Sequence, residues 1–224
     1  MEAMVKKYQQ RFKRVKEEMN RWDDLQSRLL SQFQNASSII ERLQLISDPT
    51  KYGDLKSIVG IKEALIAKQM DSLQTLLRSM NTTVDEFHGV VSSLEKIARD
   101  GRLLVKGGGS NQPTTKQLQL RVGIKPCLAD CIDGLDLLHH MHHSEYLLKL
   151  SIVSKLSALL LKPSATDLAA LHQILVDQPN IPHEEADSAH KHDFGYGGKA
   201  LRLDQERRSG TAWTKDEHRF CNKN

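Results

Sequence analysis

One stretch decides the fold of this 224-residue chain: VKKYQQRFKRVKEEMNRWDDLQSRLLSQFQNASSIIERL at residues 5–43. Its apolar residues recur at intervals of three and four, with one gap, at Val5, Tyr8, Phe12, Val15, Met19, Trp22, Leu29, Phe33, Ala36, Ile40 and Leu43. This heptad spacing is typical of a helix that buries one stripe against another helix. Gln26 fills the gap, and one polar residue at such a position can fix the register of a coiled coil. We expect a helix over residues 2–46, about 65 Å long at ~1.5 Å per residue.

The next stretch repeats this pattern after a turn. The segment SDPTKYGD at residues 47–54 contains Pro49 and Gly53, which interrupt helices. A second heptad follows at Ile66, Met70, Leu73, Leu77, Met80, Val84, Phe87, Val91, Leu94 and Ala98. We expect this helix to start at Leu55 or Ile61 and to continue to about Val105. Two helices of matching length bury both stripes as a long antiparallel coiled-coil hairpin, which we assign to residues 1–105.

The linker after the hairpin occupies residues 106–125. KGGGSNQPTTK at residues 106–116 is flexible by composition. QLQLRVGI at residues 117–124 alternates polar and apolar residues like a strand. Because a single short strand has no partner in this sequence, we expect an extended peptide along the helices.

A smaller C-terminal helical module is predicted over residues 126–182. Its long helix follows Pro126, has a weak point at Gly134, and repeats apolar or His positions at Leu128, Cys131 or Ile132, Leu135, Leu138, His142, Tyr146, Leu150, Val153, Leu156 and Leu160. Ser164 and Asp167 resemble a capping box that opens a short helix through Leu168, Leu171 and Leu175. Residues 183–224 are rich in Gly, His and charge without a sustained period, which predicts a disordered tail.

The composition agrees with an all-α protein. Only 5% of the residues are aromatic, and 13 Gly and 6 Pro are too few for the turns of a β-sandwich or barrel. No apolar run approaches the ~20 residues of a membrane span, and we expect no membrane contact. Three cysteines and the absence of a secretory signal favour an intracellular site.

Metal-binding and catalytic patterns are weak. His139 and His143 could share a metal at i and i+4, but they lack an evident third ligand, so we interpret HHMHH at residues 139–143 as a polar helix face. Cys127 and Cys131 are expected to be small buried residues. The tail offers His190, His192, His218 and Cys221, whose spacing matches no zinc motif. Because phosphate-loop, GxSxG and HExxH motifs are absent, we predict no enzyme activity and no catalytic, cofactor or metal site.

The net charge of +4 is concentrated near the start of the chain. A basic block precedes the first acidic pair and consists of Lys6, Lys7, Arg11, Lys13, Arg14 and Lys16. Such a block could contact RNA phosphates. Tyr8 and Phe12 within the block already belong to the heptad, so no aromatic platform for RNA accompanies it. We favour the solvated face of a coiled coil, on which Lys and Arg stems cover the seam.

Four segments carry a resemblance to a known family: IKEALIAKQ at residues 61–69, CLADCIDGLDLL at 127–138, SEYLLK at 144–149 and LHQILVDQPNIPHEE at 171–185. Because these segments occur in the order found in that family, the chain up to about residue 185 resembles the AAA-ATPase-interacting ribosome maturation factors, most closely their plant members. The resemblance implies a non-enzymatic subunit, present in nucleus and cytoplasm, that joins a type II AAA+ ATPase complex. There it would help to release or recycle assembly factors from precursors of the large ribosomal subunit.

The resemblance ends near Glu185. In the family a final amphipathic helix follows the segment that matches IPHEE, whereas ADSAHKHDFGYGG here cannot supply its apolar face. A splice variant or a misassigned gene end would give such a tail, which brings normal assembly of this chain into question.

The adaptor hypothesis implies two kinds of partner, an AAA+ ATPase and a coiled-coil protein, with a pre-ribosomal particle nearby. Trp22, Tyr8 and Phe33 would then either fill the seam or anchor a partner. The heptads alone equally support a structural coiled-coil subunit of a tethering, cytoskeletal or kinetochore-like assembly. A metal-binding or enzymatic role through the histidines is the third hypothesis.

Overall fold

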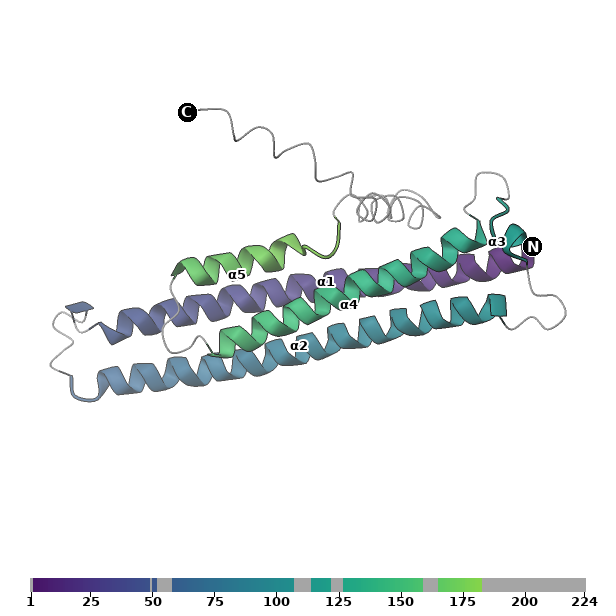
Figure 1. The fold of residues 1–224 in the computed structure, drawn as a ribbon. Coiled ribbons are helices and arrows are strands. Elements are labelled where there is room, and N and C mark those ends of the chain that lie inside the picture. The colour runs from purple at the N-terminus through teal and green to yellow at the C-terminus, as the bar shows by residue number, and fades with distance from the viewer. Residues whose placement is uncertain are drawn as a thin grey trace, which may run out of the picture. The chain divides into compact units, whose positions relative to one another are not determined.

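The fold is all-α, as predicted. The computed structural model describes residues 2–48, 50–51, 58–106, 114–121, 127–158 and 165–182, and within these ranges the chain forms five α-helices and no β-strand (Figure 1). None of the helices in the described ranges is long and apolar enough to cross a membrane. The predicted tail at residues 183–224 lies outside the described part of the chain.

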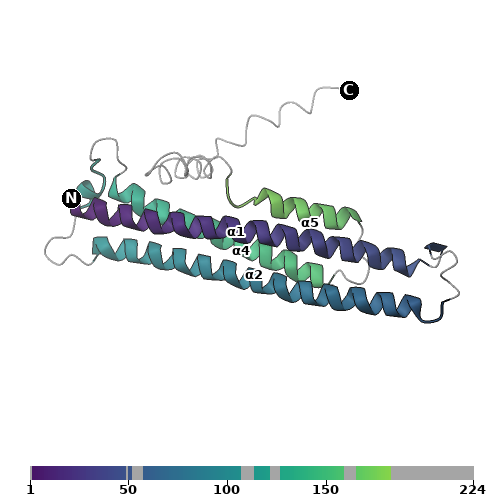
Figure 2. The ribbon, with the colours of Figure 1, turned by 180° about the vertical axis from the view of Figure 1, so that it is seen from behind.

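Helices α1 (Glu2–Ser47) and α2 (Ile61–Lys106) pack against each other as a long antiparallel hairpin (Figures 1 and 2). Each helix ends one residue beyond its predicted end, and α2 starts at Ile61, the second of the two predicted starts. Gly60 precedes it with φ at +77°, a left-handed conformation that glycine adopts without strain. The heptad spacing therefore predicted both long helices and their pairing.

The buried stripe of the hairpin is wider than one coiled-coil seam. Most of the predicted heptad residues are buried, from Tyr8 to Ile40 in α1 and from Leu73 to Ala98 in α2. Additional buried residues lie beside them at Leu25, Gln32, Ile39, Thr83, Val90 and Ile97. A wider stripe is expected where helices pack against more than one neighbour.

Helix α4 (Leu128–Ala158) is continuous through the predicted weak point at Gly134. Its buried side chains include a stripe with strictly alternating spacings of three and four residues, with Val153 buried beside it: Leu128, Cys131, Leu135, Leu138, His142, Glu145, Lys149, Ile152 and Leu156. The predicted stripe was wrong at Tyr146 and Leu150, which are only half-buried. Glu145 and Lys149 occupy the seam instead, because each finds polar partners there.

The short helix α5 (Ala165–Asp177) lies within the predicted range, and its Leu168 and Leu175 are buried as expected. Its predicted cap at Ser164 and the predicted seam residue Leu160 lie outside the described residues. Gln178 follows α5 with φ at +43°, and its amide donates to Ile174 O at 3.3 Å, which ends the helix in a left-handed turn.

The predicted extended peptide at residues 117–124 was wrong where it can be compared. Thr115–Leu118 form one helical turn, α3, and Thr114 caps it. The Thr114 hydroxyl accepts from the Gln117 amide, and the Gln117 side chain accepts from the Thr114 amide, so a capping box overrides the polar–apolar alternation. The rest of that peptide at residues 122–124 and the glycine run at 107–109 lie outside the described residues.

The helices group into two compact units, each of which combines segments from distant parts of the chain. We call them the terminal unit (residues 1–17, 93–141 and 181–224) and the central unit (residues 18–92 and 142–180). Both contain pieces of α1, α2 and α4, and α5 belongs to the central unit. The grouping does not follow the predicted division at residues 105 and 126.

Candidate interaction sites

The histidines and cysteines of α4 do not converge on a metal site. In the described part of the chain, no three His, Cys, Asp or Glu side chains are placed to hold a metal ion. His142 is buried at 3% exposure, whereas His143 faces solvent. The tail residues His190, His192, His218 and Cys221 lie outside the described part.

Cys127 and Cys131 are buried, as predicted, and they support the start of α4. The Cys127 amide donates to Asp130 Oδ2 at 3.1 Å, and the Asp130 amide donates to Cys127 Sγ at 3.4 Å. This reciprocal pair satisfies backbone donors at the helix start in the manner of a capping box. Burial raises the pKa of the Cys131 thiol to about 12, so the side chain stays neutral and acts as a small apolar residue.

The three large aromatic residues of α1 fill the interior of the protein. Tyr8, Trp22 and Phe33 have exposures of 0%, 2% and 0%. In the terminal unit, Tyr8 also donates its hydroxyl to Gly101 O of α2 at 2.7 Å. Of the two roles predicted for these residues, the structure shows the seam-filling one.

A polar cluster at the middle of the central unit was missed by the sequence analysis. We use the term polar cluster for Gln26, Glu145, Lys149 and Asn180. Lys149 Nζ donates to Gln26 Oε1 at 2.8 Å and to Glu145 Oε1 at 3.0 Å, and both charged side chains are fully buried. Burial lowers the pKa of Lys149, against the attraction of the Glu145 carboxylate, which raises it.

The rest of the polar cluster fixes the C-terminal end of α5. Glu145 Oε2 accepts from the Asn180 amide at 3.2 Å and from Asn180 Nδ2 at 3.1 Å. Gln26 Nε2 donates to Leu175 O at 2.6 Å, a carbonyl in the last turn of α5 that has no partner within a regular helix. Gln26 therefore does more than fix the register of the hairpin, as predicted from the sequence. Its side-chain amide makes hydrogen bonds to both α4 and α5.

Aromatic rings surround the ammonium group of Lys149. Its Nζ lies 5.6 Å from the Trp22 ring centroid and 5.5 Å from that of Phe87, both within cation–π range. Trp22 packs edge-on against Phe87 and against His142, and its Nε1 donates to Gln178 Oε1 at 2.9 Å. One signal in the sequence could have found this cluster: the three-four alternation continues through Glu145 and Lys149 but breaks at Tyr146 and Leu150.

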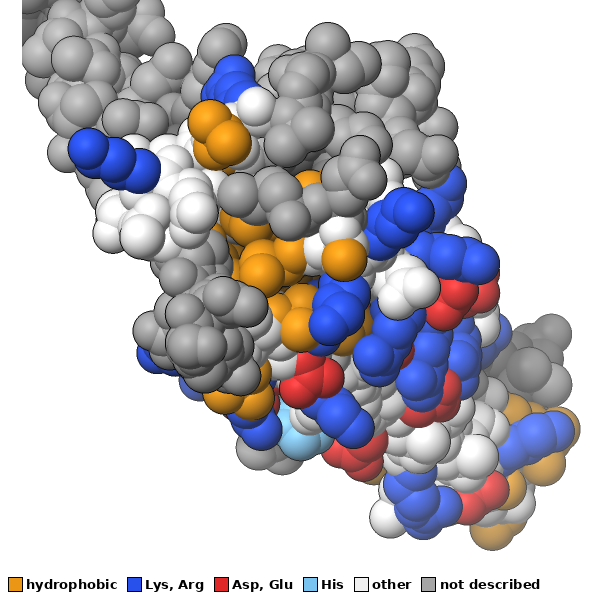
Figure 3. All heavy atoms as spheres, turned by 90° about the vertical axis from the view of Figure 1, so that its right-hand side faces the viewer, with side chains coloured by type: hydrophobic (Ala, Val, Ile, Leu, Met, Phe, Trp, Pro, Cys, Tyr) orange, Lys and Arg blue, Asp and Glu red, His pale blue; other side chains and the backbone are white. Residues whose placement is uncertain are grey.

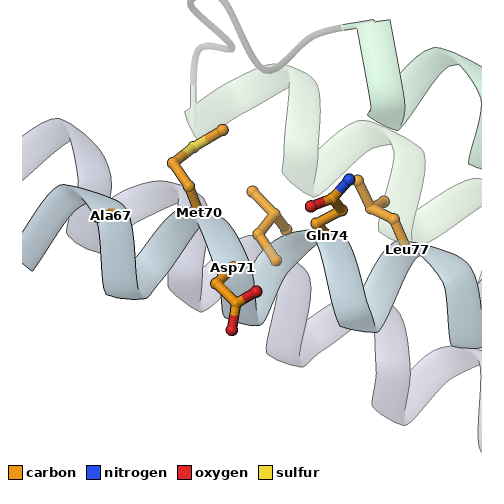
Figure 4. Close-up of a pocket in the computed structure, with 6 residues that line it drawn as sticks. Ala67, Met70, Asp71, Gln74 and Leu77 are labelled. Carbon is orange, nitrogen blue, oxygen red and sulfur yellow. The ribbon is translucent and has the colours of Figure 1, made fainter.

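An apolar groove lies on α2 in the central unit, where α2 continues past the end of α4 (Figures 1 and 2). The groove is lined by Ala67, Met70, Asp71, Leu73, Gln74 and Leu77. Met70, Gln74 and Leu77 point to one side of the helix, and Asp71 points to the other (Figure 4). The predicted burial of Met70 was wrong, since this side chain is 42% exposed.

The basic block of α1 lies in the terminal unit. Five of its side chains, Lys6, Lys7, Lys13, Arg14 and Lys16, are exposed, and Arg11 is half-buried. Arg11 donates to Lys7 O and, at 3.4 Å, to Asp100 O of α2. Figure 3 faces the end at which α1 begins and α2 ends, and Lys and Arg side chains gather right of the centre of that view, with Asp and Glu among them.

Two comparisons with known proteins bear on these sites. A family model described as CA109-like, ribosome biogenesis protein C1orf109-like, matches residues 2–193. The match includes all five helices, and therefore also the polar cluster, the apolar groove and the basic block. A comparison with curated proteins finds no match.

Proposed function

The chain belongs to the C1orf109-like family of ribosome biogenesis proteins, and from this premise we propose that it is a non-enzymatic adaptor of an AAA+ ATPase complex. In this role it acts in nucleus and cytoplasm and helps to release or recycle assembly factors from precursors of the large ribosomal subunit. The family assignment supports the ribosomal context. The four sequence segments that resemble AAA-ATPase-interacting factors, with their plant members most similar, support the ATPase partner.

The apolar groove on α2 is the single observation that carries the adaptor proposal. Met70 and Leu65 expose 42% and 36% of their surface along this part of α2. The floor of the groove is formed by Leu73 and Leu77, which are anchored in the interior at 0% and 8% exposure. Buried leucines at the base of the groove and a flexible methionine at its edge suit an apolar partner side chain that inserts from solvent.

The chemistry of the groove fits an amphipathic helix. Its lining residues recur at i, i+3, i+4 and i+7 along α2, the spacing that a second helix meets when it packs alongside. Asp71 and Gln74 supply polar groups at the border, which can orient the partner without burying a charge. We therefore assign the coiled-coil partner of the adaptor to this groove.

The experiment is affinity purification of the tagged full chain from cells, followed by mass spectrometry. We compare the wild type with a groove variant, Ala67→Glu with Met70→Glu, and with a matched control, Ser72→Glu with Thr75→Glu. All four substituted residues are exposed on α2, but only Ala67 and Met70 line the groove. We expect the wild type and the control to recover an AAA+ ATPase, large-subunit assembly factors and a helical partner, and the groove variant to lose the partner.

A third form of the chain, ended at Glu185, measures whether the tail changes this set of partners. Recovery of neither the ATPase nor the assembly factors by any form would contradict the adaptor proposal. Recovery of tethering, cytoskeletal or kinetochore proteins instead would support the structural coiled-coil alternative. Equal recovery by the groove variant and its control would remove the groove from the proposal but leave the adaptor role to other surfaces.

A further inference from the structure

The two compact units differ in charge, and the excess of positive charge lies entirely in the terminal unit. Its residues 1–17 and 93–141 contain 13 Lys and Arg against 7 Asp and Glu. Residues 18–92 and 142–180 of the central unit contain 11 against 13. A localised cationic surface attracts polyanions, whereas the same charge spread evenly would not.

We use the term cationic face for six exposed basic side chains of the terminal unit: Lys6, Lys7, Lys13, Arg14 and Lys16 of α1 and Lys96 of α2. Lys7, Arg11 and Arg14 share one side of α1, being four and three residues apart. Arg11 reaches the backbone of α2 at Asp100, so this side of α1 borders α2. Lys96 is exposed one helical turn from Asp100, on the same border.

The cations of this face are available to a ligand. In the ranges that the structure describes, the ion pairs of α1 and α2 in the terminal unit use Arg99 and Arg102 and none of the six residues of the cationic face. These six side chains are exposed, which agrees with the predicted solvated face of a coiled coil. Arg11 is half-buried and reaches the backbone of α2.

The composition of the face distinguishes among polyanions. Protein interfaces need buried apolar anchors, but among residues 3–17 the exposed side chains are small, polar or charged, and Tyr8 and Val15 are buried. Single-stranded nucleic acid is typically held by exposed aromatic rings, and none is exposed on this segment. Phosphates on a regular double helix need only cations at fixed positions, which two rigid helices supply.

We propose that the cationic face of the terminal unit binds double-stranded RNA through its phosphates, without reading its sequence. The assignment of the chain to a ribosome biogenesis family favours structured RNA over other polyanions as the ligand. The proposal goes beyond the adaptor role and is tested on the purified chain alone, so neither idea depends on the success of the other.

The test is fluorescence anisotropy with two unrelated RNA duplexes of about 20 base pairs, titrated over a range of salt concentrations. The face variant carries Lys6→Gln, Lys13→Gln, Arg14→Gln and Lys16→Gln. The matched control removes four exposed cations from the central unit by Arg42→Gln, Lys51→Gln, Lys68→Gln and Arg78→Gln. Circular dichroism and urea unfolding verify that both variants keep the helices, as expected for exposed positions.

We expect the wild type and the control to bind both duplexes alike. The face variant should bind more than about tenfold more weakly, and the slope of log K against log salt should fall by about 3 to 4, close to one per lost phosphate contact. Two outcomes would overturn the proposal: no binding of duplex RNA by the wild type, or an equal loss in both variants. Binding of a polyglutamate peptide but not of RNA would instead assign the face to an acidic protein.

Discussion

Helix α4 buries one stripe along its whole length, but its two halves use different chemistry. In the terminal unit the stripe consists of Leu128, Cys131, Leu135 and Leu138, which are apolar. In the central unit the same spacing continues through His142, Glu145 and Lys149. Apolar contacts stabilise without strong directional preference, whereas buried polar groups are stable only with their specific partners. The comparison teaches that apolar burial holds α4 in both units, since Ile152 and Leu156 are buried in the central unit, and that hydrogen bonds also position it there.

The largest effect is expected from removing one charge of the polar cluster. Lys149→Met leaves the Glu145 carboxylate fully buried without its ammonium partner, and we expect a loss of about 3–5 kcal/mol in the free energy of unfolding. Urea denaturation of the purified chain measures it. The double variant Glu145→Leu with Lys149→Met removes both charges, and its loss should be smaller by at least about 2 kcal/mol. A double variant as unstable as the single one would show that the pair itself stabilises the central unit.

The matching change in the terminal unit is Leu135→Ala. Leu135 is 2% exposed, and deleting its branched end leaves a cavity that should cost about 2–5 kcal/mol. A methyl group on Gly101 would lie 2.9 Å from Leu135 Cδ1, so Gly101→Ala is also destabilising in the wild type. In the Leu135→Ala background the added methyl fills part of the cavity. We expect the two losses to be less than additive in urea denaturation; strict additivity would contradict this packing.

A smaller effect is expected at Gln26, where the polar cluster holds α5. Gln26→Leu removes the donor to Leu175 O and the acceptor of Lys149, and should cost about 1–3 kcal/mol. The specific readout is hydrogen exchange, because the amides of α5 should exchange faster while those of α1 and α2 in the terminal unit keep their protection. The control is Gln32→Leu, because the Gln32 side chain donates its hydrogen bond to Ser79 of α2 rather than to α5. If the amides of α5 exchanged faster to the same extent in both variants, Gln26 would have no special role in holding α5.

This contrast also explains what the sequence could predict. The hairpin follows from local spacing, because an apolar residue at every third or fourth position needs only another helix to pack against. Burial of Lys149 depends on Gln26 and, through Glu145, on Asn180, which lie far away in the chain, and a pattern of apolar residues treats charged side chains as surface. The exposure of Met70 has the same origin: its spacing matches the seam, but the extent of α4 along α2 is a tertiary property. The basic block was recognisable in the sequence, whereas its continuation at Lys96 required the packing of α1 on α2.

The smallest effect concerns Tyr8, whose hydroxyl makes a buried hydrogen bond in the terminal unit. Tyr8→Phe removes the hydroxyl that donates to Gly101 O, and near pH 8 we expect a loss of about 0.5–1.5 kcal/mol. Burial raises the pKa of this hydroxyl from 10.0 to about 12. Above pH 10 the unfolded chain therefore loses this proton before the folded chain does, so the wild type loses stability as the pH rises toward 12.

The variant Tyr8→Phe has no hydroxyl to titrate, and its stability deficit should shrink above pH 10 and disappear before pH 12. Cys131, whose pKa is also raised to about 12, is present in both proteins, and its charge contributes to the raised pKa of Tyr8 in the wild type. Urea midpoints of both proteins between pH 8 and about pH 11.5 measure the gap. A gap that stays constant over this range would mean that water reaches the hydroxyl in the folded protein. The Tyr8 hydroxyl would then be a hydrated polar group, unlike the fully buried Glu145 and Lys149 of the central unit.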